Sequence, residues 1–390
     1  MKIKSVLIKL IAISIILFTA IIIVLSTTGF SIHKNSMDHF FSQHAKIDTS
    51  LFEEALTREE IVYDIDYLIN TIEEVHPAPY SAISKEDFYY LADSIKQETT
   101  NLTREGLFNK LVPLINSLKD GHTQIKFPEI SAGQDNKANF DKAHQNTNKL
   151  IQYRLYGKSI GYLFIKDFAA DRTVFFTQID SIFKQIKTDS VENLILDIRN
   201  NPGGNSELAD YLVSHIYDKP YQYSSKIQIK RSRQYYDYMQ GYFSWWFRPF
   251  SGFVKTFRDY EQTPMGELFN DIKGTKNPVK TAYIFSGKKI LLINGNTFST
   301  ALGFATIFKD HKIGTIIGEE TKAAVNGFGD MYPFDLPNSG LWVWCSTKRY
   351  IRPSGEYTDG GLQPDIFVAD TDDSVIDYTL KIIQNNELRH

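Results

Sequence analysis

The sequence predicts an α/β core domain that follows a small helical domain and an N-terminal transmembrane helix. Three observations lead to this fold class. An apolar run lies near the N-terminus, residues 58–118 carry helical spacing with capping residues, and from Ile160 onward short apolar strands alternate with helical stretches. Such alternation is typical of an α/β domain whose sheet is largely parallel or mixed.

The N-terminal segment, residues 1–30, is predicted to be a membrane anchor. Lys2, Lys4 and Lys9 flank an uncharged apolar run that approaches the length needed to cross a bilayer. A positive flank stays in the cytoplasm, so we expect a single-pass cell-membrane protein whose remaining chain is extracytoplasmic. A cleaved signal peptide is the alternative, although the run is long for one and no small-x-small cleavage site follows. Residues 31–57 are interpreted as a polar stalk.

Residues 58–125 are predicted to form the helical domain. Its first helix has a capping-box pattern, Thr57 with Glu60, and is expected to stop at the prolines of "HPAPY". Two further segments with apolar spacing of three and four follow. The domain ends in "DGHT", residues 120–123, which places a histidine directly after a helix.

Residues 150–375 are predicted to be the α/β core. The stretches "IGYLFIKDF", "NLILDIRNN" and "KILLIN" are typical of strands, and "TVFFTQIDSIFKQIK" is typical of a helix. An insertion at residues 231–260 is dense in Tyr, Phe and Trp, interleaved with Arg and Lys. This composition suits a membrane interface, a lid or substrate wall, or plain packing, and the three interpretations stay open.

Charge and cysteine content exclude several classes of function. The formal net charge of −3 gives no electrostatic footprint for nucleic acid. Cys345 is the only cysteine, so an intramolecular disulfide and a metal site built on several cysteines are both excluded. Its apolar, strand-like setting predicts a buried packing residue rather than a nucleophile. The nine histidines show no HxxxH pairing, and we predict neither a metal nor a cofactor.

Ser299 lies where a predicted strand turns into a predicted helix. The first N–H groups of a helix lack internal partners, so they can bind an anion. Ser299 therefore either caps the helix or is a nucleophile beside half of an oxyanion hole. The turn "NNPGG" offers backbone donors at Gly203 and Gly204, and "DGHT" offers His122 as a base. Together these are the parts of acyl-transfer chemistry.

Several motifs, in their order along the chain, resemble those of the C-terminal processing and tricorn-type serine peptidases, family S41. They are "DGHT", "IGYLFIKDF", "DIRNNPGG", "TFSTA", "GEET" and "GGLQPDI", spread over roughly residues 58–372. The resemblance implies a ClpP/crotonase-like α/β core and hydrolysis of peptide bonds through an acyl-enzyme on serine. Too few residues separate His122 from Ile160 for the PDZ module of many processing members, so a PDZ-type grip on substrate C-termini is not expected.

The resemblance also implies which residues form the site. Members with a Ser–Lys dyad carry the lysine at a position that falls on Ala324 here, and Lys322 is offset along the chain. The tricorn-like layout, in which a histidine ends the helical domain, fits His122 instead. The acid of that layout lies just before the closing motif, where Asp359 and Glu356 are the nearest matches.

By the same analogy, the oxyanion donors are the N–H of Gly203 or Gly204 and that of Thr300. We therefore predict a membrane-anchored extracytoplasmic serine endopeptidase with Ser299 as nucleophile, acting on peptides or proteins. Two alternatives stay open: a ligand-binding protein of the same fold that has lost catalysis, and an esterase or amidase of the cell envelope. The oligomeric state is not predicted.

Overall fold

The computed structural model describes residues 54–98, 100–127, 150–243, 248–358, 360–370 and 374–385. The predicted anchor, residues 1–30, and most of the predicted stalk lie outside these ranges. Within them, no helix is both long enough and apolar enough to cross a membrane. The described residues fall into two compact units, residues 231–269 and the remaining described residues.

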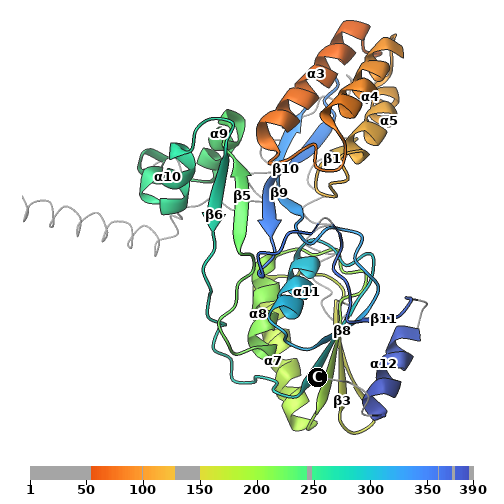
Figure 1. The fold of residues 1–390 in the computed structure, drawn as a ribbon, viewed down its shortest axis with the longest axis vertical. Coiled ribbons are helices and arrows are strands. Elements are labelled where there is room, and N and C mark those ends of the chain that lie inside the picture. Colours follow the sequence, from red (N-terminus) through yellow and green to blue (C-terminus); the bar gives the residue numbers. More distant parts are fainter. Residues whose placement is uncertain are drawn as a thin grey trace, which may run out of the picture. The chain divides into compact units, whose positions relative to one another are not determined.

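Helices α3 (Arg58–Val75), α4 (Lys85–Glu98) and α5 (Arg104–Asn116) pack together in the helical part of the larger unit (Figure 1). The predicted capping box is present, because Thr57 Oγ1 accepts the Glu60 N–H at 3.3 Å and Glu60 Oε2 accepts the Thr57 N–H at 2.8 Å. Helix α3 ends before Pro77, whose ring disfavours a helical conformation in the residue ahead of it.

A six-stranded sheet forms the α/β core. Its strand order is β11-β8-β7-β4-β3-β2, and every neighbouring pair is parallel except the antiparallel pair β2–β3. This mixed sheet confirms the predicted α/β class. The strands are β2 (Ile151–Tyr156), β3 (Ile160–Ile165), β4 (Asn193–Asp197), β7 (Lys288–Ile293), β8 (Thr315–Gly318) and β11 (Ile366–Phe367).

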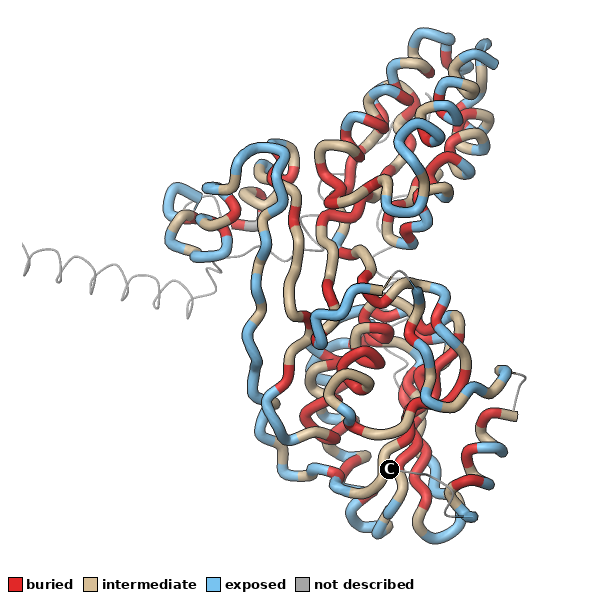
Figure 2. The backbone as a smooth tube through the Cα atoms, viewed as in Figure 1, coloured by how far each residue is buried: buried red, intermediate tan, exposed pale blue. Residues whose placement is uncertain are grey.

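Helices cover both faces of this sheet. Helices α7 (Arg172–Thr188), α8 (Ser206–Ile216) and α11 (Thr300–Asp310) lie on one face, and α12 (Ser374–Gln384) lies on the other (Figure 1). Along β4, Leu194 and Leu196 join the core under the first three helices, whereas Ile195 joins the core under α12. Strands buried on both faces need apolar side chains at every position. The buried residues accordingly concentrate in the strands and along the inner sides of the helices (Figure 2).

A second sheet carries the strands β1 (Gln124–Lys126), β5 (Lys226–Lys230), β6 (Leu268–Ile272), β9 (Phe328–Asp335) and β10 (Trp342–Ile351). Its order is β1-β10-β5-β6, and β9 pairs with β10 as an antiparallel hairpin. The tip of this hairpin is held by helix α3, because the buried Asp64 carboxylate accepts the Asn338 N–H at 2.9 Å and the Ser339 N–H at 2.8 Å. Cys345 lies buried on β10, which confirms the packing role predicted for it.

The smaller unit, residues 231–269, contains helices α9 (Arg233–Tyr242) and α10 (Lys255–Gln262) and the 3₁₀ helix η3 (Arg248–Phe253). The rings of Phe243 and Phe257 meet edge to face at 5.4 Å in its small core. The aromatic insertion predicted at residues 231–260 thus has a hydrophobic core of its own. Its function stays open.

Candidate active site

Ser299 lies at the turn between strand β7 and helix α11. Its backbone has φ 52° and ψ −122°, a conformation that side-chain-bearing residues seldom adopt. Its hydroxyl makes no capping hydrogen bond to α11. Instead, Ser299 Oγ lies 3.0 Å from Nε2 of His122. The sharp turn therefore presents the hydroxyl to the histidine rather than to the helix.

His122 lies just before strand β1 and is held from several sides. Its imidazole stacks on the Phe298 ring, with centroids 4.6 Å apart and planes 24° from parallel. Gly121 permits this contact, since a Cβ there would lie 2.8 Å from Phe298 Cζ. The backbone carbonyl of Phe328, on β9, accepts a hydrogen bond from the imidazole. One ring nitrogen is thus committed to a carbonyl and the other faces Ser299.

Burial lowers the pKa of His122 below its ordinary value of 6.5, because desolvation disfavours the charged imidazolium. Asp120, Asp330 and the Phe328 carbonyl act in the opposite direction without reversing the shift. The imidazole is therefore neutral at neutral pH. A neutral imidazole that already donates one N–H has an unprotonated second nitrogen, which is the state a general base requires.

The carboxylate of Asp120 organises the "DGHT" turn. It accepts hydrogen bonds from the His122 N–H at 3.0 Å and from Thr123 Oγ1 at 2.6 Å. On its other side it lies 3.1 Å from Nε2 of His76, at the end of helix α3. Desolvation works to raise the pKa of Asp120, but the bonds from His76 and Thr123 outweigh it and hold that pKa well below its usual range.

The candidate oxyanion donors come together beside Ser299. A Cβ added to Gly203 would lie 2.7 Å from Ser299 Cβ and 2.7 Å from the Thr300 nitrogen, so only glycine allows this approach. The Gly203 N–H already donates to Asn201 Oδ1 at 2.9 Å. In the described part of the chain, the N–H groups of Gly204 and Thr300 have no hydrogen-bond acceptor. These two fit the role best, and Thr300 Oγ1 links them by donating to the Gly204 carbonyl at 2.6 Å.

The acids expected from the family layout do not account for the groups around His122. The Glu356 carboxylate is 68% exposed and lies 3.9 Å from the Arg352 guanidinium. Asp359 lies outside the described residues. The carboxylates that act on the His122 imidazole are Asp120 and Asp330 instead. Asp120 was visible in the "DGHT" motif, whereas nothing in the sequence connects Asp330 to it.

Lys322 lies away from the Ser299 hydroxyl. Its ammonium donates to Asn296 Oδ1 at 3.2 Å, and its aliphatic chain runs past Gly295. Ala324, at the dyad position, pairs with Gly361 in an isolated bridge. No lysine is therefore found beside the serine in the described residues, in line with the histidine layout.

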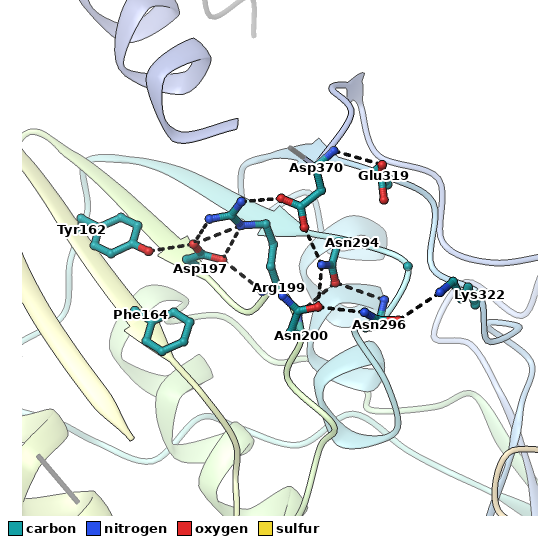
Figure 3. Close-up of a pocket in the computed structure, with 11 residues that line it drawn as sticks. Tyr162, Phe164, Asp197, Arg199, Asn200, Asn294, Asn296, Glu319, Lys322 and Asp370 are labelled. Atoms are coloured by element: carbon teal, nitrogen blue, oxygen red, sulfur yellow. Dashed lines mark hydrogen bonds and ion pairs between the residues drawn. The ribbon is translucent and has the colours of Figure 1, made fainter. Parts of the chain in front are cut away.

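A polar pocket of about 490 Å³ is lined in part by residues of the turns that follow β4 and β7 (Figure 3). At its centre the buried Asn294 amide accepts the Asn200 N–H at 2.9 Å and donates to Asn200 Oδ1 at 2.9 Å and to Asp370 Oδ2 at 2.6 Å. These bonds tie the turn after β4, which leads to Gly204, to the turn after β7, which leads to Ser299. The pocket is lined by Tyr162, Phe164, Asp197, Arg199, Asn200, Asn294, Gly295, Asn296, Glu319, Lys322 and Asp370.

No group of His, Cys, Asp or Glu side chains within the described ranges is arranged to hold a metal ion. The chemistry available from the residues described above is that of a hydroxyl, a neutral imidazole and two backbone donors. That set suffices for acyl transfer.

The sequence of this chain matches a known protein family. Residues 159–368 match the family model of peptidase family S41. A carboxy-terminal-processing protease of Bartonella bacilliformis is 27% identical over 225 residues, which cover 56% of this chain and 41% of that protein. The chain therefore matches less than half the length of this relative.

Two solved structures share the fold. Mature CPAF in complex with lactacystin superimposes with a TM-score of 0.62 at 13% identity, over 85% of this chain and 98% of that one. A structure from Parabacteroides merdae gives a TM-score of 0.56 at 20% identity, over 84% of this chain and 95% of that one. At these identities the likeness extends to the fold alone.

Proposed function

Because the chain belongs to peptidase family S41, we propose that it is a serine peptidase in which Ser299 is the nucleophile and His122 the general base. The observation that carries this proposal is the 3.0 Å separation between Ser299 Oγ and His122 Nε2, two atoms that lie 177 residues apart in sequence. This distance lies within hydrogen-bond reach for proton transfer.

In the proposed acylation step, Ser299 Oγ attacks the carbonyl carbon of the scissile peptide bond while its proton passes to Nε2 of His122. The resulting oxyanion accepts hydrogen bonds from the Gly204 and Thr300 N–H groups. These two groups fit the task because neither has a protein acceptor among the described residues, and Thr300 follows Ser299 directly and is bonded to Gly204 through its side chain. Removing one such donor typically raises the barrier by about 3 kcal/mol.

Collapse of the tetrahedral intermediate breaks the C–N bond. His122 returns its proton to the leaving amine, which leaves an acyl ester on Ser299. Water then attacks the ester with His122 again as base, and the second collapse restores the serine hydroxyl. The Phe328 carbonyl supports both steps, because it holds the imidazole in one orientation while the proton moves.

Activity of the full-length protein on casein, a loosely folded substrate, tests this proposal. Wild type is expected to release fragments, and mass spectrometry separates internal cleavage from trimming of chain ends. Ser299→Ala and His122→Ala are expected to abolish turnover, and Lys322→Ala is expected to keep most of it. Complete loss of activity in Lys322→Ala would revive the lysine dyad.

Labelling with a fluorophosphonate separates the remaining alternatives. If wild type is labelled at Ser299 but cleaves no protein substrate, the result favours an esterase or amidase. If wild type is neither labelled nor active, the result favours a binding protein of the same fold.

We also propose that residues 1–30 anchor the protein in the cell membrane with its catalytic part outside the cytoplasm. The support is the basic and apolar pattern of the sequence. Full-length protein is expected to remain in the membrane fraction after alkaline carbonate extraction. Its release into the supernatant, together with an N-terminus that begins beyond residue 25, would indicate a cleaved signal peptide.

A further inference from the structure

Asp120 is a buried carboxylate, with a side chain only 3% exposed. Its hydrogen-bond donors are the His122 N–H, the Thr123 hydroxyl and Nε2 of His76. The first two are neutral. The third is the imidazole of His76, whose other ring nitrogen contacts the Ala78 N–H.

The contacts of His76 indicate which ring nitrogen faces which partner. Its Nδ1 lies 3.1 Å from the Ala78 nitrogen and accepts the Ala78 N–H, so this ring nitrogen carries no proton. The single ring proton is then on Nε2, which donates to Asp120 Oδ2. Asp120 is therefore the acceptor in this pair, and its carboxylate is the anion beside the site.

Asp330 is the other carboxylate near His122, and its charge is compensated. Its side chain is 53% exposed, and the ammonium of Lys348 forms an ion pair with it. Water and this cation both screen its field at the imidazole. Asp120 has neither kind of screening.

The charged and titratable groups around His122 come from four elements. Helix α3 ends in His76, β5 carries Lys230 with its ammonium on the Glu73 carbonyl, β9 carries Asp330, and β10 carries Lys348 and Tyr350. Of these and the residues of the "DGHT" turn itself, Asp120 is the buried anion, and its partner among the described residues is the imidazole of His76 rather than a lysine or arginine.

We propose that Asp120 is the positioning residue that stabilises the imidazolium form of His122 during catalysis. It acts through its buried charge and through its bond to the His122 backbone, without touching the ring. The proton released by Ser299 stays on His122 Nε2, and Asp120 takes up none. This inference rests on the proposed serine–histidine mechanism and names the acid that completes it.

Titration of the His122 imidazole by NMR, in the full-length protein labelled at histidine Cε1, tests the proposal without a substrate. His122→Ala assigns the signal. In Asp120→Asn the His122 midpoint is expected to fall by about one pH unit, because an opposite charge nearby shifts a pKa by that much or more. The pH midpoint of kcat/KM is expected to fall in parallel. The plateau of kcat/KM is expected to be about tenfold lower, because a pKa change of one unit corresponds to a tenfold factor.

Two variants separate charge from structure. Thr123→Val removes a hydrogen bond from the same turn but keeps the carboxylate, and its midpoint is expected to match wild type. Asp180→Asn is the matched control, because Asp180 pairs with the buried His215 at 3.0 Å elsewhere in the core. A midpoint does not depend on the fraction of protein that is folded, so partial instability leaves the comparison valid.

The outcomes are distinguishable from failure of the proposed function. Equal His122 midpoints in wild type and Asp120→Asn overturn the role of Asp120, even if the protein hydrolyses casein. A lower midpoint in Asp120→Asn supports the electrostatic coupling, even if wild type proves inactive. Equal shifts in Thr123→Val and Asp120→Asn would show that the geometry of the turn, and not the charge, sets the His122 midpoint. This result would also overturn the role proposed for Asp120.

Discussion

At the scale of single residues, the backbone of Ser299 combines strain with function. A positive φ for a residue with a Cβ raises the free energy of the folded state by about 1–3 kcal/mol. In return, the hydroxyl faces His122 while the Thr300 N–H stays available at the start of α11. A capping serine would show the opposite arrangement, with relaxed backbone angles and its hydroxyl bonded to the helix.

Comparing Ser299→Gly with Ser299→Ala tests this strain. Both variants lack the hydroxyl and are expected to be inactive. Glycine adopts positive φ without a steric penalty, so Ser299→Gly is expected to be more stable than Ser299→Ala by about 1 kcal/mol. Thermal unfolding of the two proteins measures the difference. If alanine were as stable as glycine, the backbone at residue 299 would be unstrained.

In the proposed mechanism, the protonation of His122 sets the acid limb of activity. Its pKa is lowered by burial, so the neutral base persists below the ordinary value of 6.5. We expect the acid midpoint of wild-type kcat/KM to lie below pH 6.5. A pH series with a fluorogenic peptide measures this midpoint. A midpoint at or above pH 6.5 would contradict the burial argument.

At the scale of elements, the β9–β10 hairpin connects the helical part to the active site. Near His122 it supplies the Phe328 carbonyl, and the Ser346 N–H on β10 donates to Thr123 Oγ1 at 3.0 Å. At its tip, Asp64 of helix α3 accepts two backbone N–H groups. The hairpin therefore contacts the "DGHT" turn near one end and helix α3 at its tip.

Removing the Asp64 carboxylate tests this connection. Asp64→Ala leaves two hairpin N–H groups without their acceptor, which is expected to destabilise the protein by about 3 kcal/mol and to lower kcat severalfold. Asp66→Ala is the matched control, since Asp66 lies on the same helix with a half-exposed side chain bonded to Lys96. Chemical unfolding and casein assays measure both effects. Equal behaviour of the two variants would argue against the hairpin anchor.

At the scale of the whole molecule, Asp120 links stability to acid pH. Its pKa in the folded protein lies below the ordinary value of 3.8. Its ionised form therefore stabilises the fold above about pH 3.8, and this stabilisation is lost as the pH falls through the folded-state value.

The stability advantage of wild type over Asp120→Asn is thus expected to be constant near neutral pH and to shrink below about pH 4. Urea unfolding across a pH series measures it. An advantage that grows with acidity would mean that the folded-state pKa of Asp120 is raised instead.

Sequence and structure agree where the signal is local. The apolar stretch at Leu194–Leu196 predicts a buried strand, and the structure confirms it, since an apolar run reports burial directly. The capping box at Thr57 and the apolar setting of Cys345 are equally local and equally well predicted. Glu356 was placed beside the histidine by analogy with a motif, and its side chain is instead exposed next to Arg352.

By itself, the sequence determined the α/β core, the helical segment before it, the strand-to-helix turn at Ser299 and the family to which its motifs belong. Only the tertiary structure decided what surrounds His122. The Phe328 carbonyl could not be predicted, because every residue has one and only the pairing of β9 with β10 brings this one to the imidazole. The hydrogen bond between His76 and Asp120 likewise depends on the orientation of the His76 ring, which the Ala78 N–H fixes through a contact that forms only in the folded chain.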